Sequence, residues 1–327
     1  MHDFTILILQ QAFASNVALS LDILATAALM AEQLNMASPR WRVVSELGGP
    51  VVLGNGLQLA TSKLPRRATD IADKSVWIVP GLGVDNRKTA ANRMQERDAR
   101  WATTAIRSHV QSGGKVAAGC SSVLLLQAAG VLAGKTVTIS WWLASHLRRV
   151  QADCTVDAQR MVISDGNIIT AGAALAHTDL MLQLLRMKFG AALPDAVSRV
   201  LLIDSRSAQA QYVIPSVLAS GNALVSQLSA RIEAELPKVP GMRDLAQQMC
   251  MSERTLARHV VSATGQPPLA LVQHVRLARA RVLLETSRLS VAQVAERVGY
   301  ADATALRRMM KKAMGATPRQ LRSSVIV

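Results

Sequence analysis

The residue best suited to covalent chemistry is Cys120, which follows a short apolar run and opens a helical pattern. The segment Ala117-Ala118-Gly119-Cys120-Ser121-Ser122 has the order strand, nucleophile, helix, which is the elbow that presents a nucleophile at the end of a sheet strand. The dipole of a helix N-terminus stabilises a thiolate, so the pattern is compatible with a reactive cysteine. The alternative is a small buried residue at a tight turn, and the sequence alone favours that alternative.

A second group of residues suited to chemistry lies in the last hundred residues, which repeat themselves. Residues 245–251 match residues 294–300 in polarity, and after one inserted residue the match continues over 256–268 and 306–318. In both copies a helical pattern carries apolar residues on one side and polar residues on the other. The side chains predicted to point outward from the two recognition helices are Arg254, Thr255, Arg258, Thr304, Arg307 and Arg308.

Outward arginines at such positions can bind guanine through two hydrogen bonds or can hold phosphate. A helix-turn-helix presents a helix N-terminus to the major groove, so each copy predicts binding to double-stranded DNA. Two copies predict contacts with two major-groove segments about one helical turn apart, roughly 34 Å. A solvated charged surface would explain either helix alone, but it does not explain the same chemistry at matched positions in both.

Local signals define the ends of these helices. Ser252 is a suitable N-cap for the first recognition helix, and Ser290 with Gln293 forms a capping box at the start of the second unit. Gly299 is expected to end that helix, and Asp302 to cap the next. A long helix is predicted to connect the two units, with one apolar face made of Leu271, Val275, Ala278 and Val282.

Composition favours a globular protein with a polyanionic partner. The chain has 327 residues, a formal charge of +15 and a half share of hydrophobic residues. Residues 230–327 contain 16 basic and seven acidic residues, so the shorter C-terminal part carries +9 of that charge. The three cysteines are odd in number and lack metal-ligand spacing, which fits a reducing cytoplasm without disulfides. The sequence predicts no cofactor and no metal.

Neither a signal peptide nor a membrane span is expected. The N-terminus lacks a basic segment ahead of an apolar run. The most apolar stretches, residues 19–31 and 116–133, are interrupted by Asp22 or by Gly, Ser and Gln, and neither reaches about 20 apolar residues. The sequence therefore predicts a cytoplasmic protein that does not contact membrane.

The first two hundred residues alternate strand and helix signals. Strands are predicted at residues 4–9, 41–45, 75–79, 115–119, 136–139, 161–163 and 168–170, with residues 48–50 and 165–167 as turns. Helices are predicted at residues 16–34, 100–112, 120–129 and 175–189. This alternation predicts an α/β fold, a mostly parallel sheet between helical layers in a flavodoxin-like arrangement. An all-α domain with two helix-turn-helix units follows.

The domain boundaries follow from a change in composition after Ile203. A polar stretch runs from Asp204 to Gln211, and helical spacing resumes near Ser220. The sequence predicts one domain at residues 1–205, a linker at residues 206–222 and a DNA-binding domain at residues 223–327.

The C-terminal repeat resembles the AraC/XylS family of bacterial transcription regulators. The resemblance rests on about a hundred residues, in the segments 251–256, 276–284, 291–300 and 315–322. The chain has Val260, Leu306 and Met310 where the family usually has Phe, and Ala257 and Ala303 where it often has a polar residue. Since alanine can contact only a thymine methyl group, base recognition is expected to depend on the arginines.

The N-terminal half, from Ile6 to about Ile203, resembles the PfpI-like branch of the class I glutamine amidotransferase superfamily. The matching segments are residues 21–23, 79–83, 128–135, 156–157 and 165–172. A PfpI-like domain followed by an AraC-type domain is the order of the GlxA-like regulators. The resemblance implies a regulator that senses a small nitrogen-containing metabolite.

The resemblance also bears on whether Cys120 is catalytic. In catalytic relatives a histidine follows on a later strand, but Thr138-Ile139-Ser140-Trp141 places Ser140 at that position. His109, His146 and His177 do not align with it, and a cysteine without a base lacks the activation that acyl transfer needs. The chain is therefore predicted not to be an enzyme. The alternative is a cysteine-dependent hydrolase or amidase that carries a DNA-binding domain.

The same strand ends are predicted to bind a ligand instead. Asp22 aligns with the acidic residue that lies near the thiol in relatives, and an acidic group beside the face of a Trp suits a small amine or quaternary ammonium. Packing is the alternative reading of the Asp–Trp pair. The predicted ligand-binding residues are Asp22, Gly81, Leu82, Cys120, Ser121, Ser140 and Trp141.

Taken together, the residues and the resemblance predict a ligand-responsive, sequence-specific transcription regulator. Its partners are expected to be double-stranded DNA, a small-molecule effector and a second copy of the chain that pairs through the N-terminal domain. An architectural DNA-binding protein with an inert N-terminal domain is the third alternative, and the duplicated arginine-bearing helices favour specific recognition over it.

Overall fold

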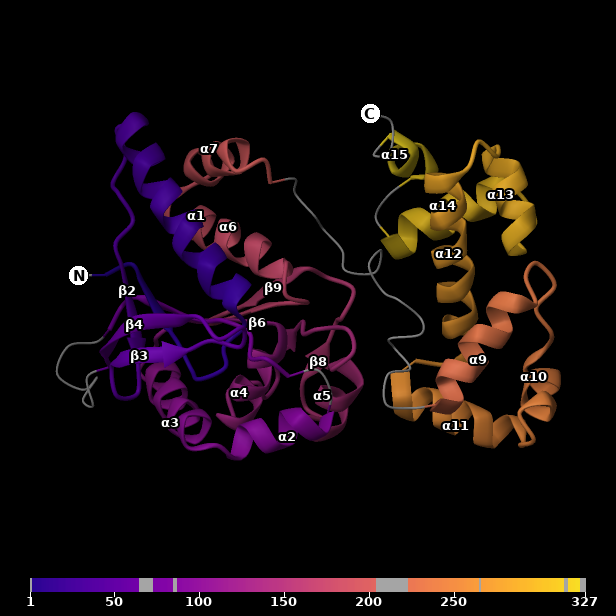
Figure 1. Ribbon diagram of the computed structural model, residues 1–327, viewed down its shortest axis with the longest axis horizontal. Coiled ribbons are helices and arrows are strands. Elements are labelled where there is room, and N and C mark those ends of the chain that lie inside the picture. The colour runs from indigo at the N-terminus through magenta and orange to yellow at the C-terminus, as the bar shows by residue number, and fades with distance from the viewer. Residues whose placement is uncertain are drawn as a thin grey trace. The chain divides into compact units, whose positions relative to one another are not determined.

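The computed structural model describes residues 2–64, 73–84, 87–203, 223–264, 266–314 and 317–323. The chain divides into two compact units, unit 1 at Met1–Ser207 and unit 2 at Ala208–Val327 (Figure 1). The predicted linker at residues 206–222 lies outside the described residues. Each unit is considered by itself below.

Unit 1 is built on an eight-stranded sheet with the order β3-β4-β2-β1-β5-β6-β10-β9. Its strands are β1 (Phe4–Leu7), β2 (Trp41–Ser45), β3 (Gly49–Val52), β4 (Gln58–Lys63), β5 (Val76–Val79), β6 (Val116–Gly119), β9 (Val162–Asp165) and β10 (Ile168–Ala171). The central pairs are parallel, and β3 and β9 are antiparallel strands at the two edges. If β1, β2, β5, β6 and β10 are numbered 1 to 5 along the chain, their order in the sheet is 2-1-3-4-5. This is the strand order of flavodoxin-like folds, so the predicted fold class is confirmed.

Helices cover both faces of this sheet (Figure 1). One face packs against α1 (Ala14–Gln33), α6 (Ala176–Phe189) and α7 (Ala192–Val200), and the other packs against α2 (Arg87–Gln95), α3 (Arg97–Gln111), α4 (Val123–Ala128) and α5 (Ala144–Val150). The side chains of β1 alternate between the two cores. Phe4 and Ile6 join the α1 side, whereas Leu7 joins the α3 side, as the period of two in a strand requires.

Two expectations for unit 1 are wrong. Residues 48–50 are not only a turn, because Gly49 and Pro50 begin β3, where an edge strand tolerates proline. The strand expected at residues 136–139 is short: β7 (Thr136–Val137) pairs with β8 (Thr155–Val156) in a separate small sheet. Among the described residues, α1 spans 20 residues and has a mean hydropathy of 1.5 over an 18-residue window, which is long and apolar enough to cross a membrane by length and composition alone. Its inner face, with Ile23 and Leu24, is buried against the sheet side of unit 1.

Unit 2 is all-α, as predicted. Its helices are α9 (Ala223–Ala234), α10 (Met242–Gln248), α11 (Glu253–Thr264), α12 (Pro268–Thr286), α13 (Val291–Val298), α14 (Ala303–Met314) and α15 (Pro318–Ser323). Figure 1 shows α9, α10 and α11 around one end of α12, and α13, α14 and α15 around the other. Each group has its own hydrophobic core.

The connecting helix α12 does not have the single apolar face that was predicted. Leu271 and Val275 are buried in the first core, but Val282 is 43% exposed. The second half of the helix instead buries Leu277 and Leu284 in the second core. Because Val275 and Leu277 are about 200° apart around a helix, α12 presents opposite faces to the two helix-turn-helix units.

Candidate functional site

The predicted elbow is present at the carboxyl end of β6. Cys120 has φ of +57°, a conformation that non-glycine residues rarely adopt, and it begins the single-turn 3-10 helix Cys120–Ser122 that leads into α4. Its backbone N–H donates to the Gly172 carbonyl at 2.8 Å, which fixes the turn. The backbone geometry of a nucleophile elbow is therefore retained.

The segment that follows β5 packs directly on this elbow. The Ser121 hydroxyl donates to the Leu82 carbonyl at 2.6 Å and accepts from the Leu82 N–H at 2.9 Å. Gly81 donates its N–H to Asn16 Oδ1 at 3.2 Å. A Cβ at Gly81 would lie 2.8 Å from Asn16 Oδ1 and 2.9 Å from the Cβ of Cys120, so only glycine allows the two segments to approach this closely.

The side chain beside the thiol is Ser140, the residue that stands in place of the expected histidine. Its hydroxyl donates a hydrogen bond to Cys120 Sγ at 3.0 Å. Burial raises the pKa of the Cys120 thiol, and the hydrogen bonds from Ser140 and Ser121 lower it by less. Cys120 is only 6% exposed. The thiol is therefore held in its neutral form, which is the poor nucleophile.

A buried histidine lies next to the elbow, but it does not contact the thiol. His177, in the first turn of α6, bonds through Nε2 to Ser20 Oγ at 2.7 Å. Its Nδ1 lies beside the backbone of Gly119 and has no hydrogen-bond partner among the described residues. Burial lowers the pKa of His177 to about 4, so the ring stays neutral near pH 7. The hydrogen bond of His177 thus goes to α1 and not to the thiol of Cys120.

The structure brings together five of the seven predicted ligand-binding residues: Gly81, Leu82, Cys120, Ser121 and Ser140. Trp141 follows Ser140 in the chain, is buried, and packs its ring edge-on against Trp142 with 5.1 Å between the ring centroids. Asp22 is exposed on α1 and lies about 200° around the helix from Ser20, which faces the elbow.

Sequence reasoning missed Asn16 as the polar residue of α1 at the elbow. Asn16 is buried, accepts from Gly81, and donates from Nδ2 to the Ala174 carbonyl at 2.7 Å. It lies in the first turn of α1, six residues before Asp22. The signal that could have found it is the rarity of a buried amide in an apolar helix, because such a group needs partners on neighbouring segments.

The two helix-turn-helix units have the same backbone geometry. In the first unit the turn after α10 contains Cys250, with φ of +56°, and in the second the turn after α13 contains Gly299, with φ of +83°. The N–H of the next residue closes each turn in the same way, from Met251 to the Ala246 carbonyl at 3.0 Å and from Tyr300 to the Ala295 carbonyl at 2.9 Å. The predicted repeat is thus also a structural repeat.

The recognition helices α11 and α14 place matched side chains on matched faces. Leu256 and Val260 are buried in α11, and Leu306 and Met310 are buried in α14. The exposed predicted residues are Arg254, Arg258, Thr304, Arg307 and Arg308, while Thr255 is half-buried. The Thr255 hydroxyl shares a hydrogen bond of 2.9 Å with Ser252 Oγ, which also accepts from the Thr255 N–H as the N-cap of α11.

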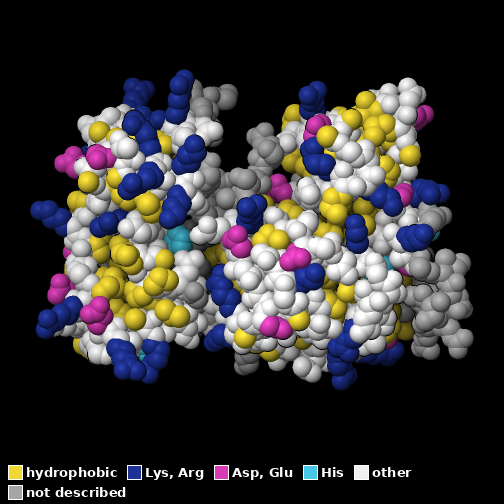
Figure 2. All heavy atoms as spheres, turned by 180° about the vertical axis from the view of Figure 1, so that it is seen from behind, with side chains coloured by type: hydrophobic (Ala, Val, Ile, Leu, Met, Phe, Trp, Pro, Cys, Tyr) yellow, Lys and Arg dark blue, Asp and Glu magenta, His cyan; other side chains and the backbone are white. Residues whose placement is uncertain are grey.

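Lys and Arg side chains are prominent on the surface of the chain (Figure 2).

The helices of the second helix-turn-helix unit have well-defined N-terminal caps. The predicted capping box is present at the start of α13, where Ser290 and Gln293 each accept from the other's backbone N–H. Asp302 caps α14 by accepting from the Ala305 N–H at 2.7 Å. The arginines are therefore carried on helices whose N-terminal ends are firmly fixed, as recognition of a groove requires.

Comparisons with known proteins agree with this architecture. A model of the DJ-1/PfpI family matches residues 23–187, and a model described as a helix-turn-helix domain matches residues 245–324. The chain is 25% identical over 311 residues to the HTH-type transcriptional regulator GlxA of Rhizobium meliloti, which covers 91% of this chain and 90% of GlxA. It is 24% identical over 288 residues to the HTH-type transcriptional regulator GbdR of Pseudomonas aeruginosa, covering 86% and 74% respectively.

A solved structure supports the fold of unit 1. The crystal structure of an AraC family transcriptional regulator from Pseudomonas putida superposes with a TM-score of 0.51 at 19% identity, covering 62% of this chain and all of that one. The two relatives described above, which align over most of the chain, are both named as HTH-type transcriptional regulators. The chain belongs to the DJ-1/PfpI family and carries an AraC-type helix-turn-helix domain after it.

Proposed function

We propose that the chain is a sequence-specific transcription regulator whose DNA-binding domain is residues 223–327. The observation that carries the proposal is the matched exposure of Arg258 and Arg308 on α11 and α14, which lie on a structurally repeated scaffold. The other proposed DNA contacts are Arg254, Thr255, Thr304 and Arg307. Specific recognition of two groove segments explains why both helices keep the same polar face.

Selection from a random DNA library tests this proposal. The full-length chain should enrich duplexes that contain two short motifs with centres about 10 base pairs apart, one for each recognition helix. Uniform retention of all sequences would identify an architectural DNA-binding protein instead. No retention at low salt would contradict DNA binding altogether, since phosphate contacts alone give affinity there.

We also propose that unit 1 binds a small nitrogen-containing effector and has no hydrolase activity. The environment of Cys120 supports the second part, because burial raises the pKa of the thiol and its neighbour Ser140 is a hydrogen-bond donor and not a base. The elbow side chains are buried and bonded to one another. We therefore propose that the elbow positions the segment after β5, and that the effector enters elsewhere in unit 1.

The chain is further proposed to act in the cytoplasm as a dimer that pairs through unit 1. The support is α1, an apolar helix of which only 39% of the most apolar window is buried. Its outward residues Ala18, Asp22, Ala25 and Leu29 follow helical spacing on one exposed stripe, which is apolar except for Asp22. Sedimentation velocity should show a dimer that Leu29→Arg dissociates, whereas Leu57→Arg, at an equally exposed leucine outside α1, should leave it intact. A monomeric wild-type chain would contradict pairing.

A further inference from the structure

Unit 1 contains a cavity of about 480 Å³ that is separate from the elbow. It lies beyond the carboxyl ends of β1 and β2, between β3 and the first turn of α3. A volume of this size is typical of small-molecule sites, and the ends of parallel strands are where open α/β sheets bind ligands. The lining residues on which the argument depends are Ile8, Glu46, Pro50, Val51, Arg97 and Asp98.

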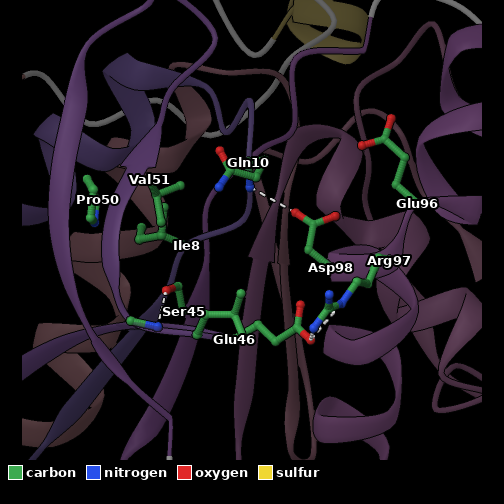
Figure 3. Close-up of a pocket in the computed structure, with 11 residues that line it drawn as sticks. Ile8, Gln10, Ser45, Glu46, Pro50, Val51, Glu96, Arg97 and Asp98 are labelled. Atoms are coloured by element: carbon green, nitrogen blue, oxygen red, sulfur yellow. Dashed lines mark hydrogen bonds and ion pairs between the residues drawn. The ribbon is translucent and has the colours of Figure 1, made fainter.

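The two sides of the cavity differ in chemistry (Figure 3). Ile8, Pro50 and Val51 lie together on one side and form an apolar wall. The charged side chains, Glu46, Glu96, Asp98 and Arg97, lie on the opposite side. Arg93 pairs with both Glu96 and Asp98, so with Arg97 counted this side carries one net negative charge. An anionic ligand would meet this excess of negative charge, whereas a cationic ligand would complement it.

One of these carboxylates is already saturated by partners from the chain. Asp98 makes a two-pronged ion pair with the buried Arg93, with both nitrogen–oxygen distances at 2.7 Å. It also accepts from the Gln10 backbone N–H at 2.9 Å. Because Asp98 already accepts these three hydrogen bonds, a ligand would gain little free energy by binding to it.

Glu46 is different, because its partner is exposed and engages only half of the carboxylate. Arg97 donates from Nε at 3.3 Å and from Nη2 at 3.2 Å, and both bonds go to Glu46 Oε1. Within the part of the chain that the structure describes, Glu46 Oε2 has no hydrogen-bond partner. The Glu46 side chain is 18% exposed and that of Arg97 is 72% exposed. A mostly buried carboxylate is thus paired with a solvated arginine, whose exposed ion pair stabilises little and can be exchanged.

We propose that this cavity binds a small organic cation, an ammonium or guanidinium group on a short apolar body. The cationic group bonds to Glu46, taking Oε2 and displacing Arg97, while the apolar body lies on Ile8, Pro50 and Val51. The inference rests on the proposed function, because it names the binding site and the charge of the effector that unit 1 is proposed to bind.

The cavity is also connected to the elbow and to α1 through one short segment. The Gln10 side chain accepts from the Val52 N–H at 3.1 Å in the cavity wall. The next residues turn away from the cavity: the Gln11 carbonyl accepts from Gly83 at 3.1 Å, and the Phe13 N–H donates to the Gly81 carbonyl at 2.7 Å, just before α1 begins. A ligand bound in the cavity could therefore shift the position of the first turn of α1, the helix proposed for pairing, if it binds one arrangement of this segment more tightly than another.

The test uses the full-length chain and three compounds that share a four-carbon body: n-butylamine, butyrate and 1-butanol. Binding is followed by ligand-observed NMR at constant ionic strength. n-Butylamine should bind with a saturable dissociation constant, and butyrate should not bind. Equal binding of butyrate and n-butylamine, or no binding of the amine, overturns the proposal.

Variants then locate the site. Glu46→Gln should weaken n-butylamine binding by about tenfold or more, because it removes the charge-assisted hydrogen bond. Glu32→Gln, which removes a carboxylate from the exposed end of α1, should not change binding. Arg97→Ala removes the competing guanidinium and should tighten binding, a gain that misfolding cannot produce. Unchanged binding in both Glu46→Gln and Arg97→Ala overturns the site.

The DNA selection is carried out on the same wild-type chain that is tested for amine binding, which separates this inference from the proposed function. Enrichment of a DNA motif without amine binding overturns the cavity alone. Amine binding without motif enrichment supports the cavity and contradicts the role as a sequence-specific regulator.

Discussion

The hydroxyl of Ser140 donates a hydrogen bond to the thiol of Cys120 at the end of β6, with 3.0 Å between Oγ and Sγ. A hydroxyl at this position stabilises negative charge on sulfur slightly, but it cannot take the thiol proton at neutral pH. Burial acts in the other direction and dominates, so the pKa of Cys120 is raised. The elbow thus retains the backbone of a nucleophile site while its side chains hold the sulfur in the unreactive form.

The first prediction concerns thiol reactivity. At pH 7.5 iodoacetamide should alkylate the exposed Cys250 at least about tenfold faster than the buried Cys120, since only accessible thiolate reacts. Quantitative mass spectrometry of tryptic peptides over time gives both rates in one sample. In denaturant the two rates should converge, and labelling of native Cys120 as fast as Cys250 would show that the thiol is activated.

The second prediction concerns pH. The pKa of His177 is lowered by burial from 6.5 to about 4, so between these pH values the unfolded chain binds a proton at this residue and the folded chain does not. The free energy of unfolding is therefore unaffected by this group above about pH 6.5 and decreases as the pH falls toward 4, by at most about 3 kcal/mol. The pKa values of His109 and His274 are also lowered by burial, which adds to the same trend.

Urea denaturation at pH values from 4.5 to 7.5 measures this loss. His177→Gln removes the titrating group, so its free energy of unfolding should depend less steeply on pH than that of the wild type. The comparison of slopes holds even if the variant is less stable overall. Equal slopes would mean that another group governs the acid sensitivity.

The elements that the sequence predicted best are those with strong periodicity or capping. The parallel sheet, α6 and the capping box at Ser290 follow from local patterns that the tertiary structure reinforces. The edge hairpin of β3 and β4 was missed, because Gly49 and Pro50 signal a turn in isolation. Only pairing with β4 makes this segment a strand, and pairing is not a local property.

The site was harder to predict than the fold for a related reason. Alignment to a family pattern selected Asp22, but the helix geometry points Asn16 and Ser20 toward the elbow and leaves Asp22 exposed. Likewise, α12 has no single apolar stripe, because Val275 and Leu277 face two different cores. Which face of a helix is covered depends on its neighbours, which a single sequence does not specify.

A third prediction uses the repeated turns of unit 2. Cys250 and Gly299 occupy equivalent left-handed positions, but only Gly299 is free of the steric cost that a Cβ imposes there. Cys250→Gly should raise the free energy of unfolding by about 0.5–1 kcal/mol, because relief of strain exceeds the added entropy of the unfolded chain. Chemical denaturation of the two proteins measures the difference.

Gly299→Ala is the reciprocal substitution and should destabilise unit 2 by about 2 kcal/mol or more. A Cβ at this position would collide with the carbonyl oxygen of Pro237 and would press on the Arg276 guanidinium, besides requiring a positive φ. If Cys250→Gly were neutral and Gly299→Ala harmless, the left-handed turns would not be the constraint that the structure indicates.

The last prediction separates base recognition from phosphate contact. Arg258→Ala and Arg308→Ala each remove an exposed guanidinium from the polar face of a recognition helix, opposite Leu256 or Leu306. If each arginine bonds a guanine, affinity for the selected DNA motif should fall by about 1–3 kcal/mol while affinity for random DNA changes little. Fluorescence anisotropy with both duplexes, at several salt concentrations, measures the two effects. Arg199→Ala removes the same charge from α7 in unit 1 and should leave both affinities unchanged. An equal loss on both duplexes, with a salt slope that falls by about one, would assign the arginine to a phosphate and leave sequence recognition to other residues of α11 and α14.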